Sequence, residues 1–177
     1  AMRFMTAYLS VTEGEHVLTG TERMKQRPIK ILVDALRSLG ADIQYIGEEG
    51  FPPLRIKGKR LTGGSIEVAG NVSSQYVSAL LMIGPTLEKG LELKLLGNVI
   101  SRPYIDLTMN VMHEYGANAE WTDIDTITIR PKRYEERSYT IENDWTSASY
   151  WYAILTLLND RKSYIRFTGL KNGSRQG

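Results

Sequence analysis

Cysteine is absent from the 177 residues of this chain, and histidine is almost absent. Without cysteine the chain cannot form a disulfide bond, a thiolate metal site or a cysteine nucleophile. The two histidines, His16 and His113, belong to no HExxH pattern and have no carboxylate at the spacing of a metal site. We therefore expect both histidines to be structural and no metal to be bound.

Long apolar runs and a large net charge are also missing. No run of about 18 apolar residues occurs, so the sequence predicts no membrane-spanning helix. The formal net charge is +2 and basic residues are interspersed with acidic ones, which argues against nucleic acid as a partner. The chain opens AMRFMTAYL, which has no pattern of a secretory or transit segment. With 42% hydrophobic and 24% charged residues, the composition is typical of a globular protein.

Two segments place hydroxyl side chains at the start of a helix-like apolar pattern. They read NVSSQYVSALL (71–81) and SRPYIDLT (101–108). The start of a helix exposes unpaired backbone N–H groups and the positive end of the helix dipole, and added serines suit it to a phosphate or carboxylate. The two segments therefore predict binding of an anionic metabolite, although serine at such positions also serves as an ordinary helix cap.

The sequence repeats itself. Residues 16–43 match residues 93–119, since each segment has a strand-like run ending in glycine, then Arg-Pro, a helical pattern, Gly-Ala and a second strand. Residues 65–81 likewise match residues 138–155. The unit is roughly helix–strand–helix–strand–strand–strand, which we interpret as βαβαββ counted from the glycine-terminated strand. The equivalent glycines that follow this strand are Gly20, Gly97 and Gly169.

Apolar periodicity locates the elements of this unit. Spacings of i, i+3, i+4 and i+7 predict two helices whose first turns contain Pro28 and Pro103. Gly40 and Gly116 are expected to end these helices as left-handed caps. Further helices are expected at residues 2–11, after Ser73 and after Thr146. Strands are expected at residues 16–19, 43–46, 54–57, 65–68, 91–95, 126–129, 138–141 and 164–168.

The register of the repeat indicates a chain cut at both ends. It opens inside a unit, at the helix of residues 2–11, and stops just after the first strand of another unit. A self-contained repeat protein begins and ends with capping elements instead. We expect one partial domain, made of the end of one unit (1–14), a second unit (15–90), a third unit (91–162) and the start of a crossover (163–177).

The motifs, taken in order, resemble those of one enzyme family. Nearly end to end, the chain carries AMR, RMKQRPI, LVDALRSLGA, PPLRIKG, GNVSSQYVSALLM, SRPYIDLT, ENDWTSASY and GLKNGSRQG. This series resembles the 5-enolpyruvylshikimate-3-phosphate synthases (3-phosphoshikimate 1-carboxyvinyltransferases). The resemblance implies transfer of the carboxyvinyl group of phosphoenolpyruvate to the 5-hydroxyl of shikimate 3-phosphate, with release of phosphate. It places the reaction in the shikimate pathway of aromatic amino acid biosynthesis.

The same resemblance implies the fold class and the partners. The fold would be α+β, with repeated βαβαββ units of the enolpyruvyl transferase fold in an inside-out α/β barrel-like domain. The family has two such domains of three units, so this chain would be most of one domain, incomplete at both ends. No cofactor is implied. The expected partners are the two substrates and the missing second domain of the same protein, with no nucleic acid or membrane, in a cytoplasmic monomer.

By position in the motifs, the resemblance implies a shikimate 3-phosphate site. Ser73, Ser74 and Ser101 would bind the 3-phosphate. Gln75 would contact both substrates, and Tyr104 would lie along the shikimate ring. Each charge-assisted contact to a phosphate at a helix start contributes about 1.5–3 kcal/mol, which is consistent with that role. Without the resemblance, plain helix caps and helix-surface residues would explain the same side chains.

Two arginines and an aspartate complete the implied site. Arg27, in RMKQRPI, would bind the phosphate of phosphoenolpyruvate, because a guanidinium offers two parallel hydrogen bonds. Arg3, in the remnant of a GTAMR motif, would lie at the same pocket edge, although it could pair with a carboxylate instead. Asp144 matches the acidic residue of the family's E-G-D-A-S-S motif, here E-N-D-W-T-S, and could be catalytic or only a helix cap. Phe4 replaces the proline usual after AMR, which we interpret as a tolerated core change.

The resemblance also implies that much of the chemistry lies outside this chain. In the family, a lysine near the N-terminus and the acid, base and cationic groups of the other domain supply it, so we expect no transferase activity and weak binding from this chain alone. Two other functions are considered. One is the sibling enzyme acting on UDP-N-acetylglucosamine, which typically carries a reactive loop cysteine, and SSQY with SRPYIDLT argues against it. The other is a non-catalytic repeat domain that binds an anionic ligand or a partner protein.

Overall fold

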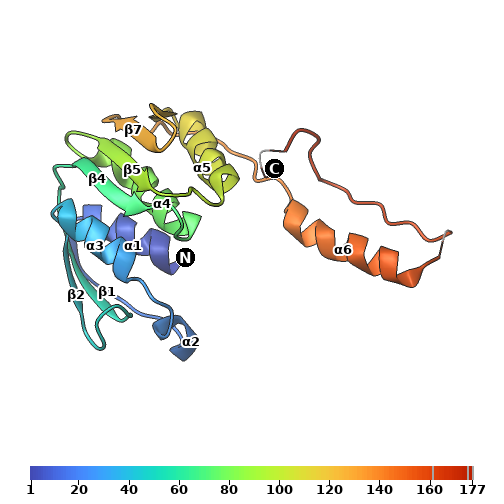
Figure 1. The fold of residues 1–177 in the computed structure, drawn as a ribbon, viewed down its shortest axis with the longest axis horizontal. Coiled ribbons are helices and arrows are strands. Elements are labelled where there is room, and N and C mark those ends of the chain that lie inside the picture. The colour runs from blue at the N-terminus through green and yellow to red at the C-terminus, as the bar shows by residue number, and fades with distance from the viewer. Residues whose placement is uncertain (161, 175, 177) are drawn as a thin grey trace. The chain divides into compact units, whose positions relative to one another are not determined.

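The computed structural model describes residues 1–160, 162–174 and 176, and Figure 1 colours the chain from blue at its N-terminus to red at its C-terminus. The chain divides into a unit of residues 1–136 and a unit of residues 137–177. The elements of the first unit are α1 (Met2–Val11), β1 (Gly14–Leu18), α2 (Glu22–Lys25), α3 (Lys30–Ser38), β2 (Asp42–Tyr45), β3 (Leu54–Gly58), β4 (Gly64–Ala69), α4 (Ser74–Ile83), the 3-10 helix η1 (Gly84–Thr86), β5 (Leu91–Leu96), α5 (Arg102–Glu114), β6 (Asn118–Trp121) and β7 (Thr126–Arg130).

The strands of the first unit form two sheets that share one pattern. In the sheet β1-β3-β2, the strand that comes last in the chain lies in the middle and pairs antiparallel with both neighbours. In the sheet β4-β5-β7-β6, the strands β5, β7 and β6 repeat this arrangement, and β4 adds to β5 in parallel. The equivalent helices α3 and α5 are followed by glycines with positive φ, 95° at Gly40 and 83° at Gly116. The predicted internal repeat is therefore confirmed in strand order, pairing and helix capping.

Sheet membership divides the first unit differently from the predicted repeat boundaries. β4 and β5 are parallel neighbours, so the predicted boundary between residues 90 and 91 separates two paired strands. The order βαβαββ begins at β4 and runs through α4, β5, α5 and β6 to β7, rather than beginning at a strand that precedes Gly20 or Gly97. Strand pairing does not test where a sequence repeat begins, and the unit boundaries after residues 14, 90 and 162 stay predictions.

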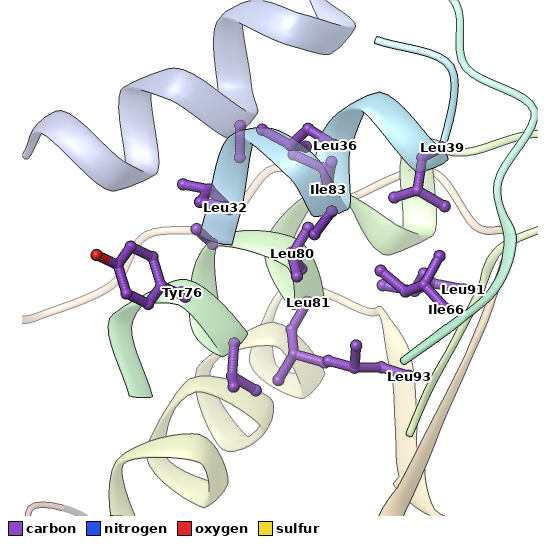
Figure 2. Close-up of a cluster of buried hydrophobic side chains, with 14 of the residues drawn as sticks. Leu32, Leu36, Leu39, Ile66, Tyr76, Leu80, Leu81, Ile83, Leu91 and Leu93 are labelled. Carbon is purple, nitrogen blue, oxygen red and sulfur yellow. The ribbon is translucent and has the colours of Figure 1, made fainter. Parts of the chain in front are cut away.

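The core holds α4 in place between neighbouring helices. Figure 1 shows α1 and α3 between the two sheets, and α4 packs against α1 on one flank and α5 on the other. The sequence of α4, SQYVSALLMI, is apolar on most sides, which suits an enclosed helix. Figure 2 shows Leu80 and Leu81 of α4 among side chains of α3, β4 and β5. Burial of one leucine side chain contributes about 1.5–3 kcal/mol, so this layer holds α4 firmly in the core.

The second unit contains one helix, α6 (Trp145–Leu158), between segments without regular secondary structure. The strands predicted at residues 138–141 and 164–168 are not formed, so those two predictions are wrong. A strand needs a paired neighbour for its backbone groups and an apolar surface for one face. The described part of this unit provides neither, since Ile141 is 84% exposed, Tyr164 is 83% exposed and Ala148 is the one buried side chain of α6.

The other predicted elements are present with small differences. The remaining six strand predictions coincide with β1 to β5 and β7, and β6 follows the second Gly-Ala as the repeat implied. Pro103 lies in the first turn of α5 as predicted. The same prediction for Pro28 is wrong, because α3 begins only at Lys30 and the amide of Ile29 donates to Gly50 O instead. Among the residues described, none of the helices combines the length and apolar character needed to cross a membrane.

Candidate anion-binding site

Ser73 and Ser74 begin α4, just beyond the carboxyl end of β4. Ser73 is the N-cap residue, yet its side chain makes no capping hydrogen bond to the first turn. A side-chain cap therefore does not explain this serine. The amide of Tyr76 donates to Ser73 O at 2.9 Å, and the N–H groups that precede it in the helix keep their capacity to bind a ligand. Ser73 is exposed and Ser74 half-buried, so the positive end of a well-packed helix opens to solvent here.

Ser101 occupies the same place at the start of α5, just beyond the carboxyl end of β5. It also makes no capping hydrogen bond, and its backbone is left-handed, with φ 58° and ψ 32°. This conformation costs a non-glycine residue about 1–2 kcal/mol, and such strain is found preferentially at functional sites. Tyr104, in the first turn of the same helix, is 56% exposed.

The two helix starts lie at one edge of the four-stranded sheet. Because β4 and β5 are parallel neighbours, their carboxyl ends and the loops that follow them emerge together. The amide of Ile100 donates to Gly70 O at 3.2 Å and ties these two loops directly. The serines of both motifs therefore emerge on the side of the sheet where α/β proteins commonly bind ligands.

Arg3 of α1 reaches across to the start of α4. Its Nη1 donates to Oε1 of Gln75 at 2.6 Å and to Oγ of Ser73 at 3.2 Å. The guanidinium carbon lies 4.4 Å from the centroid of the Tyr76 ring. The alternative of a carboxylate partner is not realised, since none of the ion pairs among the described residues includes Arg3. Its charge is held by neutral groups and is available to an anion.

Arg27 lies in the turn between α2 and α3 and lines the same small cleft as Arg3 and Gln75. The cleft has a volume of about 40 Å³, and its lining also includes the apolar residues Met24 and Pro28. Arg27 is exposed, and within residues 1–160, 162–174 and 176 no carboxylate forms an ion pair with it. Two arginines without acidic partners at one cleft favour a small, strongly charged anion such as a phosphate.

Tyr76 supports both arginines, and the sequence patterns did not single it out. Its hydroxyl donates to Pro28 O at 2.7 Å, while its ring lies under the guanidinium of Arg3. The side chain is 6% exposed, so it fixes the turn carrying Arg27 against the start of α4. The available signal was a tyrosine directly after Ser-Ser-Gln, which by itself cannot be distinguished from an ordinary core aromatic.

Asp144 belongs to the second unit, where it caps α6. Its Oδ1 accepts a hydrogen bond from the amide of Thr146 at 2.9 Å, and its Oδ2 accepts one from the Ser147 hydroxyl at 2.7 Å. The Ser147 hydroxyl, followed by the Thr146 amide, holds the pKa of Asp144 below its ordinary value. The carboxylate thus serves as a helix cap, and its catalytic role stays a prediction.

The predicted site residues of the first unit therefore form two groups. The group that meets around the cleft is Arg3, Arg27, Ser73 and Gln75. The group that emerges at the same sheet edge is Ser74, Ser101 and Tyr104. The family model of EPSP synthase (3-phosphoshikimate 1-carboxyvinyltransferase) matches residues 1–177, which is the whole chain. The chain belongs to the EPSP synthase family.

Relatives within the EPSP synthase family are close in sequence. The chain is 57% identical over its whole length to the 3-phosphoshikimate 1-carboxyvinyltransferase of Bacteroides fragilis (strain YCH46) and covers 43% of that protein. It is 42% identical over its whole length to the protein of the same name from Histophilus somni (strain 2336) and covers 41% of it. The chain thus spans less than half the length of these relatives.

Solved structures confirm the enolpyruvyl transferase fold and the α+β class. EPSP synthase from Acinetobacter baumannii superposes with a TM-score of 0.71 at 24% identity, over 85% of this chain and 33% of that one. The enolpyruvyl transferase NikO from Streptomyces tendae superposes with a TM-score of 0.52 at 20% identity, over 69% of this chain and 28% of that one. Identities this low establish the fold alone, whereas the close relatives establish the family.

Proposed function

We propose that the protein containing this chain is a 3-phosphoshikimate 1-carboxyvinyltransferase. It would transfer the carboxyvinyl group of phosphoenolpyruvate to the 5-hydroxyl of shikimate 3-phosphate and release phosphate. The observation that carries the proposal is the position of Arg3, which joins the helix start at Ser73 and Gln75 to the cleft of Arg27. Two anionic substrates that must react need adjoining sites, and this arrangement supports the proposal that they bind side by side.

The helix starts are proposed to bind shikimate 3-phosphate. Ser73, Ser74 and Ser101 would donate hydroxyl hydrogen bonds to the 3-phosphate, together with N–H groups at the start of α4. Tyr104 would lie along the ring, and Gln75 would contact both substrates. The missing capping bonds at Ser73 and Ser101 support this role, because both hydroxyls can turn toward a ligand.

The two arginines are proposed to bind phosphoenolpyruvate and to assist departure of its phosphate. The 5-hydroxyl would give its proton to a base, and its oxygen would bond to the second carbon of phosphoenolpyruvate while the methylene carbon takes up a proton from an acid. The tetrahedral intermediate would then lose a proton from that methyl group and release phosphate, which restores the double bond. Arg27, with Arg3 at the pocket edge, would bind the phosphate through both steps and stabilise its growing charge.

The remaining catalytic groups are proposed to lie in another domain of the same protein. The chain spans 43% of the Bacteroides fragilis relative, and the described residues that line the cleft include no aspartate, glutamate, histidine or lysine. Asp144 is the candidate within this chain. We further propose that this protein is a cytoplasmic monomer that acts on small molecules, in which this chain works together with the second domain of the same protein.

A hybrid enzyme tests the proposal. It is the Bacteroides fragilis relative in which this chain replaces the matching residues, position for position. The expected result is release of phosphate from phosphoenolpyruvate that depends on shikimate 3-phosphate, at a rate within about tenfold of the parent enzyme, which is about 1.4 kcal/mol in the barrier. Turnover of UDP-N-acetylglucosamine in place of shikimate 3-phosphate, or no calorimetric binding of shikimate 3-phosphate, would overturn the proposal.

Arg27 and Arg23 provide a matched pair within this test. Arg27→Gln should raise the KM for phosphoenolpyruvate about tenfold or more, since a charge-assisted contact to phosphate is lost. Arg23→Gln removes an exposed arginine from α2 that does not line the cleft, and KM should change less than twofold. Equal effects of both substitutions would show that overall charge, not the cleft, governs binding.

A further inference from the structure

Arg102, next to Ser101, is held by aromatic and carbonyl groups and does not point freely to solvent. Its guanidinium carbon lies 3.9 Å from the centroid of the Trp121 ring, which is a cation–π contact. Its Nη1 donates to Ile124 O at 3.3 Å. Trp121 and Ile124 belong to β6 and to the turn that leads into β7. The residue after the strained serine is therefore fastened to the neighbouring hairpin.

Trp121 holds the same helix at a second point. Its indole Nε1 donates to Oδ1 of Asp106 at 2.8 Å, and Asp106 lies four residues after Arg102 on one face of α5. The indole thus binds the cation with its face and the carboxylate with its N–H edge. One side chain therefore holds the start of α5 at Arg102 and again one turn later at Asp106, on either side of Tyr104.

The preceding repeat uses its equivalent residues differently. Arg27 and Arg102 occupy the same place in the Arg-Pro motif, and Tyr45 and Trp121 each end the strand that follows the helix. Tyr45 contacts Arg37 from the far end of α3, at 5.1 Å, and among the described residues its buried hydroxyl has no hydrogen-bond partner. Arg27 is therefore left to the cleft, whereas its counterpart Arg102 is engaged by the hairpin.

We propose that Trp121 is a positioning residue for the shikimate 3-phosphate site, acting through Arg102 and Asp106 on the first turn of α5. The inference rests on the proposed function above. Ser101 has a left-handed backbone and no capping bond of its own, so the orientation of its hydroxyl depends on contacts made by the residues beside it. The hairpin supplies those contacts, and Trp121 itself does not touch the substrates.

The hybrid enzyme tests this inference with graded variants of Trp121. Trp121→Leu removes both the ring face and the N–H group and should raise the KM for shikimate 3-phosphate on the order of tenfold. Trp121→Phe keeps a ring face for Arg102 and should give an intermediate increase, as should Asp106→Asn. The KM for phosphoenolpyruvate should change less than twofold in every case, because Arg3 and Arg27 lie on other elements.

Tyr45→Leu is the matched control. It removes the equivalent aromatic residue and its arginine contact from the preceding repeat, at the opposite end of α3 from Arg27. It should lower the melting temperature without raising either KM. The same pattern in Trp121→Leu, or a rise of both substrate KM values together, would overturn the inference because it would indicate a purely structural role.

Failure of the inference can be distinguished from failure of the proposed function. If the unmodified hybrid enzyme does not bind shikimate 3-phosphate, the proposed function fails and the inference with it. If the hybrid binds normally and the Trp121 variants keep its KM for shikimate 3-phosphate, only the inference fails. Trp121→Phe keeps most of the side-chain volume, so a folded variant is available even if Trp121→Leu unfolds.

Discussion

A residue at a helix N-cap can satisfy the helix or serve a ligand, and this chain contains both cases. Asp144 caps α6 through two hydrogen bonds, so its carboxylate is occupied locally. Ser73 and Ser101 hold equivalent positions on α4 and α5 but make no capping bond. The difference lies in local conformation, since the backbone of Asp144 is extended whereas that of Ser101 is left-handed. Residue type alone does not reveal this difference, and it favours the two serines as ligand-binding groups.

The serine at position 101 should lower the stability of the fold while its hydroxyl strengthens binding of the substrate. Ser101→Gly removes the side chain from a left-handed position, so the variant should be more stable to urea than Ser101→Ala by about 1 kcal/mol. Both variants lack the hydroxyl and should weaken binding of shikimate 3-phosphate by the hybrid enzyme to a similar extent. Urea unfolding and calorimetry measure the two effects separately. Equal stability of the two variants would contradict the left-handed conformation.

The stability of helix α6 should depend on pH, because a titrating carboxylate caps the helix. The hydrogen bonds to Asp144 favour its charged form, so the pKa in the folded state lies below that of the unfolded chain. The stabilisation is therefore complete above about pH 4, the ordinary value for aspartate, and is lost as pH falls through the lower folded-state pKa. NMR titration of the carboxylate and circular dichroism from pH 7 to pH 2 would measure this.

Asp144→Asn is the control for the pH effect. An asparagine caps a helix without a titrating group, so the helix content of this variant should vary less with pH in the acidic range. A carboxylate of Asp144 that titrates at or above its ordinary pKa would show that the cap does not form in solution.

The contact between α1 and β3 should tolerate no added side chain. Gly58 ends β3 beneath the C-terminal end of α1, and a Cβ there would overlap the carbonyl oxygens of Leu9 and Thr12. Gly58→Ala should therefore lower the free energy of unfolding by about 1–3 kcal/mol. Gly47→Ala is the control, because its nearest neighbour would be Pro53 Cδ at 4.0 Å. Urea denaturation of both variants measures the difference, and equal midpoints would contradict the predicted overlap.

The first unit should fold without the second. Hydrogen bonds hold its last residues against the rest of the unit. The Tyr134 hydroxyl donates to Met82 O at 2.8 Å, and the amide of Glu135 donates to Tyr115 O at 2.8 Å. Burial raises the pKa of Tyr134 to about 12, so the phenol remains a donor at all ordinary pH values. A chain of residues 1–136 should therefore unfold cooperatively, with the midpoint of the full chain in urea.

The separate second unit should behave differently. A 14-residue helix with one buried side chain is marginal in water, so a peptide of residues 137–177 should be only partly helical by circular dichroism and should lose that helix without a cooperative transition. A cooperative transition in this peptide, or loss of near-ultraviolet dichroism in the chain of residues 1–136, would contradict the division of the molecule.

Local sequence patterns predicted the elements well where an element depends mainly on its own residues. The apolar spacing of α3 and α5, the glycines after them and the alternation in β5 are short-range features, and each recurs in the structure. The strands predicted at residues 138–141 and 164–168 failed for the opposite reason. A strand exists only with a partner, and alternation within a segment does not say whether a partner is in place.

The amino-acid sequence alone established the repeat, the family and the residue types of the site, because these reside in the order of short motifs. Tertiary structure decided which of those side chains meet. The bond from Arg3 to Ser73 joins residues 70 positions apart, and Tyr76 reaches Pro28 over 48 positions. Tertiary structure also gave different surroundings to the arginines of the two Arg-Pro motifs. Trp121 contacts Arg102, whereas Arg27 lines the cleft. Such contacts depend on how helices and strands pack, and a local sequence pattern does not show which residues far apart in the chain will meet.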